Sequence, residues 1–212
     1  MFQLPPTTIV NKVIPKNAFD NYTSSKQKRM FTDKVAKIKW ENKLSASTIN
    51  LGGNEVEEIQ IFSIVLKEKD QIGDLLQIID RSIPYPIIFR ITHDDETMIS
   101  LAKKHPHPTN ENTAVIDWIF TSGWFVNSEN PYQLNLKQSL DFIFNDLCFQ
   151  LSGKPQSESS DIATLIEKEQ QIMQLQQKIT KLEQEIKRCK QFNRKVELNL
   201  ELQEYKSIFH AL

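Results

Sequence analysis

Residues 56–66 read Val-Glu-Glu-Ile-Gln-Ile-Phe-Ser-Ile-Val-Leu and decide the fold class. Toward its end this run is β-branched and apolar on both faces, which is typical of a strand in the interior of a sheet. The apolar residues of 72–79 then recur at helical spacing, and Pro84 prevents that helix from continuing beyond Ser82 or Ile83. A helix placed after a central strand predicts one crossover to a further strand.

Three more strand patterns follow this helix. Residues 86–92 and 97–102 are short strand candidates, and the charged run between them favours an exposed hairpin turn. Residues 113–121 form a third run, and an amphipathic helix pattern spans 136–151. Together these patterns predict an α+β fold with a mixed, mainly antiparallel sheet of about four strands and flanking helices.

Two helices are expected before the central strand. A short helical pattern covers 16–22, and Ser24 can cap a longer helix that follows. In this longer helix Phe31, Val35 and Ile38 are spaced by four and three residues, so they would form one apolar stripe beside a cationic face.

A change of composition marks the end of the globular part. The last helix pattern ends at Gly153 and Pro155, and small polar residues follow. We therefore predict a globular domain over 1–152, a linker over 153–160 and a helical arm over 161–212.

The arm has the apolar rhythm of a coiled coil. Apolar residues recur in steps of three and four from Leu165 onward, and 157–212 contain no Gly or Pro. One continuous helix of this length would be about 80 Å long, so another helix must cover its apolar seam, unless the arm folds back. The rhythm is displaced by two residues near 191–199, where we expect a bend or a new contact. The predicted oligomer or partner interface comprises Leu165, Ile172, Leu175, Ile179, Leu182, Ile186, Cys189, Phe192, Asn193, Val196, Leu200, Leu202 and Phe209.

Length and composition exclude several classes of function. The 212 residues include 26 Lys+Arg, 27 Asp+Glu and only five glycines, which fits a globular protein without a phosphate-cradling loop or dinucleotide fingerprint. Cys148 and Cys189 have no paired spacing, so we expect no zinc site or disulfide framework, and a cytosolic location is favoured. No run approaches the roughly 20 apolar residues that cross a bilayer. We therefore predict neither a membrane nor a cofactor.

Charge is unevenly spread along the chain. Residues 1–45 hold nine Lys+Arg and three Asp+Glu, a balance of +6, whereas residues 46–100 hold four and ten, a balance of -6. The basic segment could follow a phosphate backbone, with a tryptophan stacking on bases, or its lysines could simply face solvent or the acidic segment. The candidate nucleic-acid contacts are Lys26, Lys28, Arg29, Lys34, Lys37, Lys39, Trp40 and Lys43.

One short string has the pattern of a nuclease. Glu41-Asn42-Lys43 has the carboxylate-x-Lys spacing with which metal-dependent nucleases hold a divalent ion and position a water. Such a site needs a second acid upstream, and Asp33 is the one close candidate. Asp33 is expected within a helix, where its carboxylate is poorly placed, and acid-x-Lys strings also arise by chance in charged chains.

Several strings carry a resemblance to a known family. They lie at 29–44, 58–62, 83–85 and 191–199, and the most specific are Trp-x-Asn-Lys-Leu and Phe-Asn-Arg-Lys-Val-Glu-Leu-Asn. With these strings the chain resembles an uncharacterised bacterial family, domain of unknown function 4391. The resemblance implies genes beside helicases and DNA methyltransferases in restriction-like, anti-phage clusters, but no activity and no catalytic residue.

These observations predict a non-catalytic adaptor subunit of a DNA-processing defence system. Its C-terminal helix would bind a second copy or a helicase or methyltransferase partner, with DNA as a further partner. The alternatives are the metal-dependent nuclease with Asp33, Glu41 and Lys43, and a nucleic-acid-binding module that uses the basic N-terminal helix.

Overall fold

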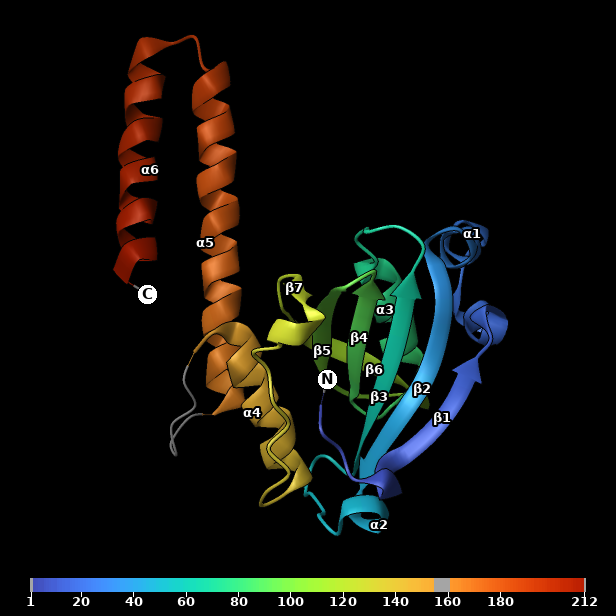
Figure 1. Ribbon diagram of the computed structural model, residues 1–212. Helices are drawn as coiled ribbons and strands as arrows, with labels where there is room; N and C mark the ends of the chain where they lie inside the picture. The colour runs from blue at the N-terminus through green and yellow to red at the C-terminus, as the bar shows by residue number, and fades with distance from the viewer. Residues whose placement is uncertain (1, 155–160, 212) are drawn as a thin grey trace. The chain divides into compact units, whose positions relative to one another are not determined.

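The computed structural model describes residues 2–154 and 161–211, and Figure 1 shows the path of the chain. The chain forms two compact units, Met1–Gln156 and Ser157–Leu212. The first is an α+β domain, and the second, where described, consists of two helices. Residues 155–160 of the predicted linker lie outside the described residues.

A sheet of seven strands, counted over the described residues, forms the centre of the first unit. The strand order is β1-β2-β3-β4-β5-β6, and β7 pairs with the start of β5. Among these strands only β3 and β4 are parallel neighbours, because α3 (Gly73–Ser82) carries the chain back between them (Figure 1). The strands are β1 (Ile9–Ile14), β2 (Val35–Ser45), β3 (Glu58–Leu66), β4 (Ile87–His93), β5 (Glu96–His107), β6 (Asn110–Thr121) and β7 (Phe125–Val126).

The prediction of about four strands is wrong. The pattern of Val35 and Ile38 predicts a continuing helix, but α1 (Ser25–Lys34) ends at Lys34 and both residues belong to β2. A register shift between Val35 and Lys37 adds one residue to β2, so Val35 and Ile38 share a face of the sheet although they are three residues apart. Each is 1% exposed, so a bulged strand imitates helical spacing here. The mainly antiparallel pairing and the helical C-terminal part agree with the structure.

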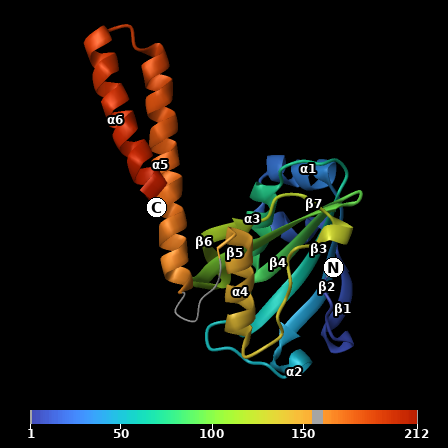
Figure 2. The same ribbon diagram turned by 60° about the vertical axis from the view of Figure 1, so that its left-hand side comes forward.

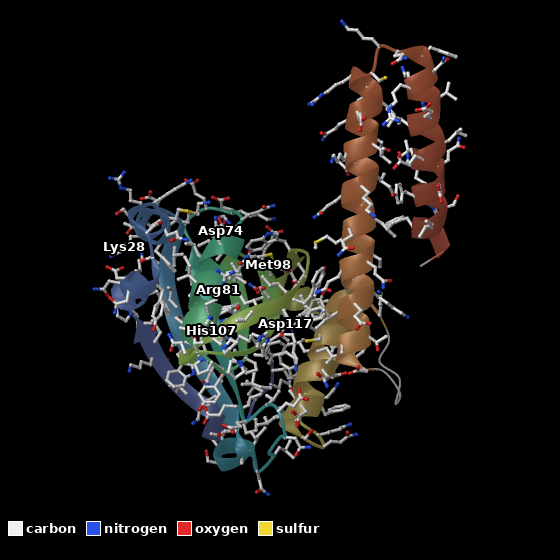
Figure 3. All side chains as sticks on the ribbon, turned by 180° about the vertical axis from the view of Figure 1, so that it is seen from behind. Lys28, Asp74, Arg81, Met98, His107 and Asp117 are labelled. Atoms are coloured by element: carbon white, nitrogen blue, oxygen red, sulfur yellow. The ribbon has the colours of Figure 1, made fainter. Side chains whose placement is uncertain are left out.

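Helices cover both faces of the sheet. On one face, the α3 face, Phe31 of α1 and Ile79 of α3 share an apolar core with Phe62 and Phe89 from the strands. Figure 3 shows this face, with α3 in front of the strands. Figures 1 and 2 show α4 on the opposite side of the sheet, the α4 face. The remaining elements of this unit are η1 (Pro6–Thr8), η2 (Lys16–Tyr22), α2 (Ala46–Ile49), η3 (Asn127–Glu129) and α4 (Leu140–Ser152).

The second unit is a helical hairpin. α5 (Ile162–Arg188) and α6 (Phe192–Ala211) lie side by side after a break at residues 189–191 (Figure 1). Leu182 on α5 and Leu198 on α6 are both buried. The arm is therefore folded back as two helices and is not one continuous helix. The break falls at the start of the segment where the sequence predicts a change of phase.

Candidate functional site

α6 carries apolar residues on two different sides. Residues spaced by three or four positions lie along one side of a helix. One such set, the inner stripe, consists of Leu198, Leu202, Tyr205 and Phe209. A second set on another side of the helix, the outer stripe, consists of Phe192, Val196 and Leu200.

The two stripes differ in their contact with α5. Leu198 of the inner stripe is 1% exposed, and the ammonium of Lys178 on α5 lies 5.1 Å from the ring centroid of Tyr205. In the outer stripe Phe192 is 77% exposed and Leu200 is 63% exposed. The inner stripe thus packs on α5, whereas the outer stripe presents apolar side chains at regular helical spacing to solvent, as an interaction surface does.

The predicted interface residues divide between these sides. Those on α5 and in the break are buried or half-buried, and so are Leu202 and Phe209 of the inner stripe. Asn193 is exposed beside the outer stripe. Much of the apolar seam that the sequence assigns to another molecule is therefore already buried or half-buried in the single chain. The α5 and break residues of the predicted interface are Leu165, Ile172, Leu175, Ile179, Leu182, Ile186 and Cys189.

Ion pairs join α5 and α6 away from the outer stripe. Lys206 Nζ lies 2.7 Å from Glu183 Oε1, and its hydrogen bond lowers the pKa of the Glu183 carboxyl. Arg194 lies 3.0 Å from Glu197 and 3.8 Å from Glu185 of α5. The hairpin thus has contacts of its own that do not depend on the outer stripe.

The three predicted nuclease residues do not converge. Asp33 is exposed on α1, which packs on the α3 face. Glu41 Oε1 accepts a hydrogen bond of 2.8 Å from Arg90 Nη2, and Arg90 points to the α4 face because Phe89 beside it lies in the core of the α3 face. Lys43 forms an ion pair with Glu58, with 2.9 Å between Lys43 Nζ and Glu58 Oε1. Within the described residues no group of three or more His, Cys, Asp or Glu could hold a metal ion.

The predicted nucleic-acid contacts are also dispersed. Trp40 is partly buried against the core, 6.3 Å from Phe62 between ring centroids, so its ring is not free to stack on bases. Lys39, its neighbour on β2, points to the other face of the sheet. Three of the lysines are paired with acids: Lys28 with Asp20, Lys34 with Asp70 and Lys43 with Glu58. The residues of the set without an ion pair in the described part of the chain are Lys26, Arg29, Lys37 and Lys39.

Arg90 is not among the sequence-predicted site residues. It is partly buried and interrupts the apolar run of β4, Ile-Ile-Phe-Arg-Ile. A charge at such a position signals a buried partner, because an unpaired charge inside a protein is costly. That partner, Glu41, comes from β2, and the distance along the chain hides the pairing from the sequence.

Comparisons with known proteins identify a family. No curated protein and no solved structure matches this chain. None of the helices in the described residues is long and apolar enough to cross a bilayer. The model of the family described as Domain of unknown function (DUF4391) matches residues 2–208, which include most of both units. The resemblance seen in the sequence is confirmed, and the chain belongs to this family.

Proposed function

We propose that the chain is a non-catalytic adaptor subunit of a bacterial DNA-processing defence system, and that its helical hairpin docks another protein through the outer stripe of α6. The exposure of this stripe carries the proposal. Phe192, Val196 and Leu200 are 77%, 44% and 63% exposed on a helix whose other side already packs on α5. Burying an apolar side chain of this size contributes about 1.5–3 kcal/mol, so a helix laid along the stripe would be stabilised by it.

The geometry of the globular unit supports a role without catalysis. Asp33, Glu41 and Lys43 point to different surroundings, and two of them are held in ion pairs. The defence context rests on the family resemblance, and it makes a helicase or a DNA methyltransferase the partner to test first.

The test compares two sets of surface changes on α6. The stripe variant is Phe192→Ser with Leu200→Ser, and the control is Ile208→Ser, because Ile208 is 44% exposed on the same helix but outside the stripe. Tagged full-length chains are expressed in the native host, and the co-purified helicase or methyltransferase is quantified beside the molar mass from light scattering. We expect wild type and control to retain the partner or a dimer, and the stripe variant to lose it.

Equal helicity by circular dichroism shows that the stripe variant keeps its hairpin. Retention of the same partner or dimer by the stripe variant would contradict the proposal, and so would a monomeric wild type without any helicase or methyltransferase.

A further inference from the structure

The strand β1 forms one edge of the sheet. It is the first strand in the spatial order and pairs with β2 alone, and Figures 1 and 2 show it at the outer side of the strands. No backbone hydrogen bond outside the ladder involves residues 10–14, as far as the chain is described. The N–H and C=O groups of this stretch that point away from β2 are therefore free to pair with a further strand.

Apolar side chains are exposed along this edge. Ile9 is 61% exposed and Val13 is 55% exposed. Val13 is the direct partner of Lys39, so both lie on the α4 face of the sheet. Neighbouring strands are about 4.8 Å apart, so a β-branched side chain on an added strand would pack directly beside Val13.

The opposite face of the same edge carries a free positive charge. Lys12 is exposed and is the direct partner of Trp40, which packs against the core of the α3 face. Lys12 makes no ion pair or side-chain hydrogen bond within the described part of the chain. Because β1 contains no acidic residue, a carboxylate on an added strand would find Lys12 unopposed.

The edge has two features that restrict which strands can pair with it. The β1–β2 register shifts between Ile9 and Lys12, where Asn11 has a positive φ of 56°, and a bulge of this kind twists an edge. Bulges and edge lysines both discourage indiscriminate pairing. A second copy of β1, paired about a two-fold axis, would bring two copies of Lys12 close together, and like charges across strands are destabilising. Lys12 therefore selects against self-pairing and in favour of an acidic strand.

We propose that β1 binds, as an added strand, an extended segment of a partner protein in which acidic and β-branched residues alternate. Successive side chains of a strand point to opposite faces, so the carboxylates of such a segment lie beside Lys12 and its β-branched residues lie beside Val13. Nucleic acid fits this edge less well, because β1 has one lysine, no arginine and no aromatic ring for stacking. The site belongs to the globular unit and does not depend on the outer stripe of α6.

The test titrates the ¹⁵N-labelled full-length chain with three short peptides, followed by NMR. The first peptide alternates Glu and Val, the second alternates Lys and Val, and the third is the Glu-Val peptide with its backbone amides N-methylated. We expect the first to shift the amide signals of β1 with a Kd of about 1 mM or tighter, and the other two to bind at least about tenfold more weakly. The N-methylated peptide keeps the charge but cannot pair as a strand, so it separates strand addition from simple attraction between charges.

Three results would overturn the proposal. One is the absence of β1 shifts up to about 10 mM Glu-Val peptide, and another is equal binding of the N-methylated peptide. The third is a response of the same amides to protein concentration or to a single-stranded oligonucleotide without any response to the Glu-Val peptide, which would assign the edge to self-pairing or to nucleic acid.

A charge reversal locates the binding at β1. Lys12→Glu should weaken the Glu-Val peptide about tenfold and make the Lys-Val peptide the better ligand. Lys26→Glu is the matched control, because it makes the same change at an exposed lysine of α1 that has no ion pair in the described chain, and it should leave both Kd values within about twofold of wild type. Both lysines are exposed, so both variants should fold. An unchanged preference in Lys12→Glu would show that β1 is not the binding edge.

Discussion

Lys104 Nζ lies 2.9 Å from Asp80 Oδ1, and the two side chains are 1% and 3% exposed. The same ammonium donates to the backbone oxygens of Asp80 and Ile83, so all three of its hydrogens are used. Burial raises the pKa of the Asp80 carboxyl to about 6, against the attraction of Lys104. The pair fastens the end of α3 to β5.

Lys104→Met should destabilise the domain strongly. The change leaves the Asp80 carboxylate and two carbonyls buried without their donor, which costs about 3–5 kcal/mol in comparable cases. The double variant Asp80→Asn with Lys104→Met should lose less than the sum of the two single changes, because no uncompensated charge remains. Urea unfolding at pH 7 measures both. Lys103→Met is the matched control: its ion pair is with Glu55, a side chain that is 77% exposed, and a loss above about 1 kcal/mol there would contradict the argument.

The Asp80–Lys104 pair illustrates which features of the fold local sequence patterns predict and which they do not. Local patterns carried the prediction of the strand at 56–66, the helix that follows it and the helical C-terminal part, because each depends on neighbours in the chain. The pairs Asp80–Lys104 and Glu41–Arg90 join residues 24 and 49 positions apart, so no local pattern contains them. The sequence does not predict β2 as a strand, because its bulge gives Val35 and Ile38 a helical spacing. For the hairpin, the sequence shows which residues form the apolar seam. It does not show which of them pack against α6 in the same chain.

Gly53→Ala should disrupt the loop before β3. A Cβ at Gly53 would lie 2.8 Å from Asp141 Oδ2 and would collide with the carbonyl oxygen of Val56. Overpacking against backbone costs about 1–3 kcal/mol, so we expect a loss in that range by thermal or urea unfolding. Gly52→Ala is an adjacent control, because a Cβ there meets nothing within 4 Å. A loss for Gly52→Ala as large as that for Gly53→Ala would show that glycine flexibility, and not the collision, matters.

Asp141 gives this loop a pH dependence. Desolvation acts to raise the pKa of its carboxyl, but hydrogen bonds from the backbone N–H groups of Asn54, Val56 and Glu55 outweigh it, so the pKa lies below the ordinary value of 3.8. A lowered folded-state pKa contributes stability above pH 3.8 that is lost as pH falls through the folded value. Asp141→Asn should therefore cost most near pH 7, and the difference from wild type should shrink below about pH 4. A stability difference that stays constant from pH 7 to about pH 3 would count against an ionised Asp141 carboxylate as the acceptor of these hydrogen bonds.

Leu198→Ala and Leu200→Ala separate the stability of the hairpin from its proposed binding. Both residues lie on α6. Leu198 belongs to the inner stripe that packs on α5 and is 1% exposed, whereas Leu200 belongs to the outer stripe and is 63% exposed. Removing the buried side chain should cost about 2–5 kcal/mol, whereas the exposed one should cost less than about 0.5 kcal/mol. Because the hairpin is a separate compact unit, hydrogen exchange of the α5 and α6 amides measures the effect locally, where unfolding of the whole chain would mix two transitions. Faster exchange in Leu198→Ala alone means that the outer stripe is dispensable for the hairpin and is kept for another purpose. Equal acceleration in Leu200→Ala would make the outer stripe part of the hairpin's own packing and would remove the ground for docking there.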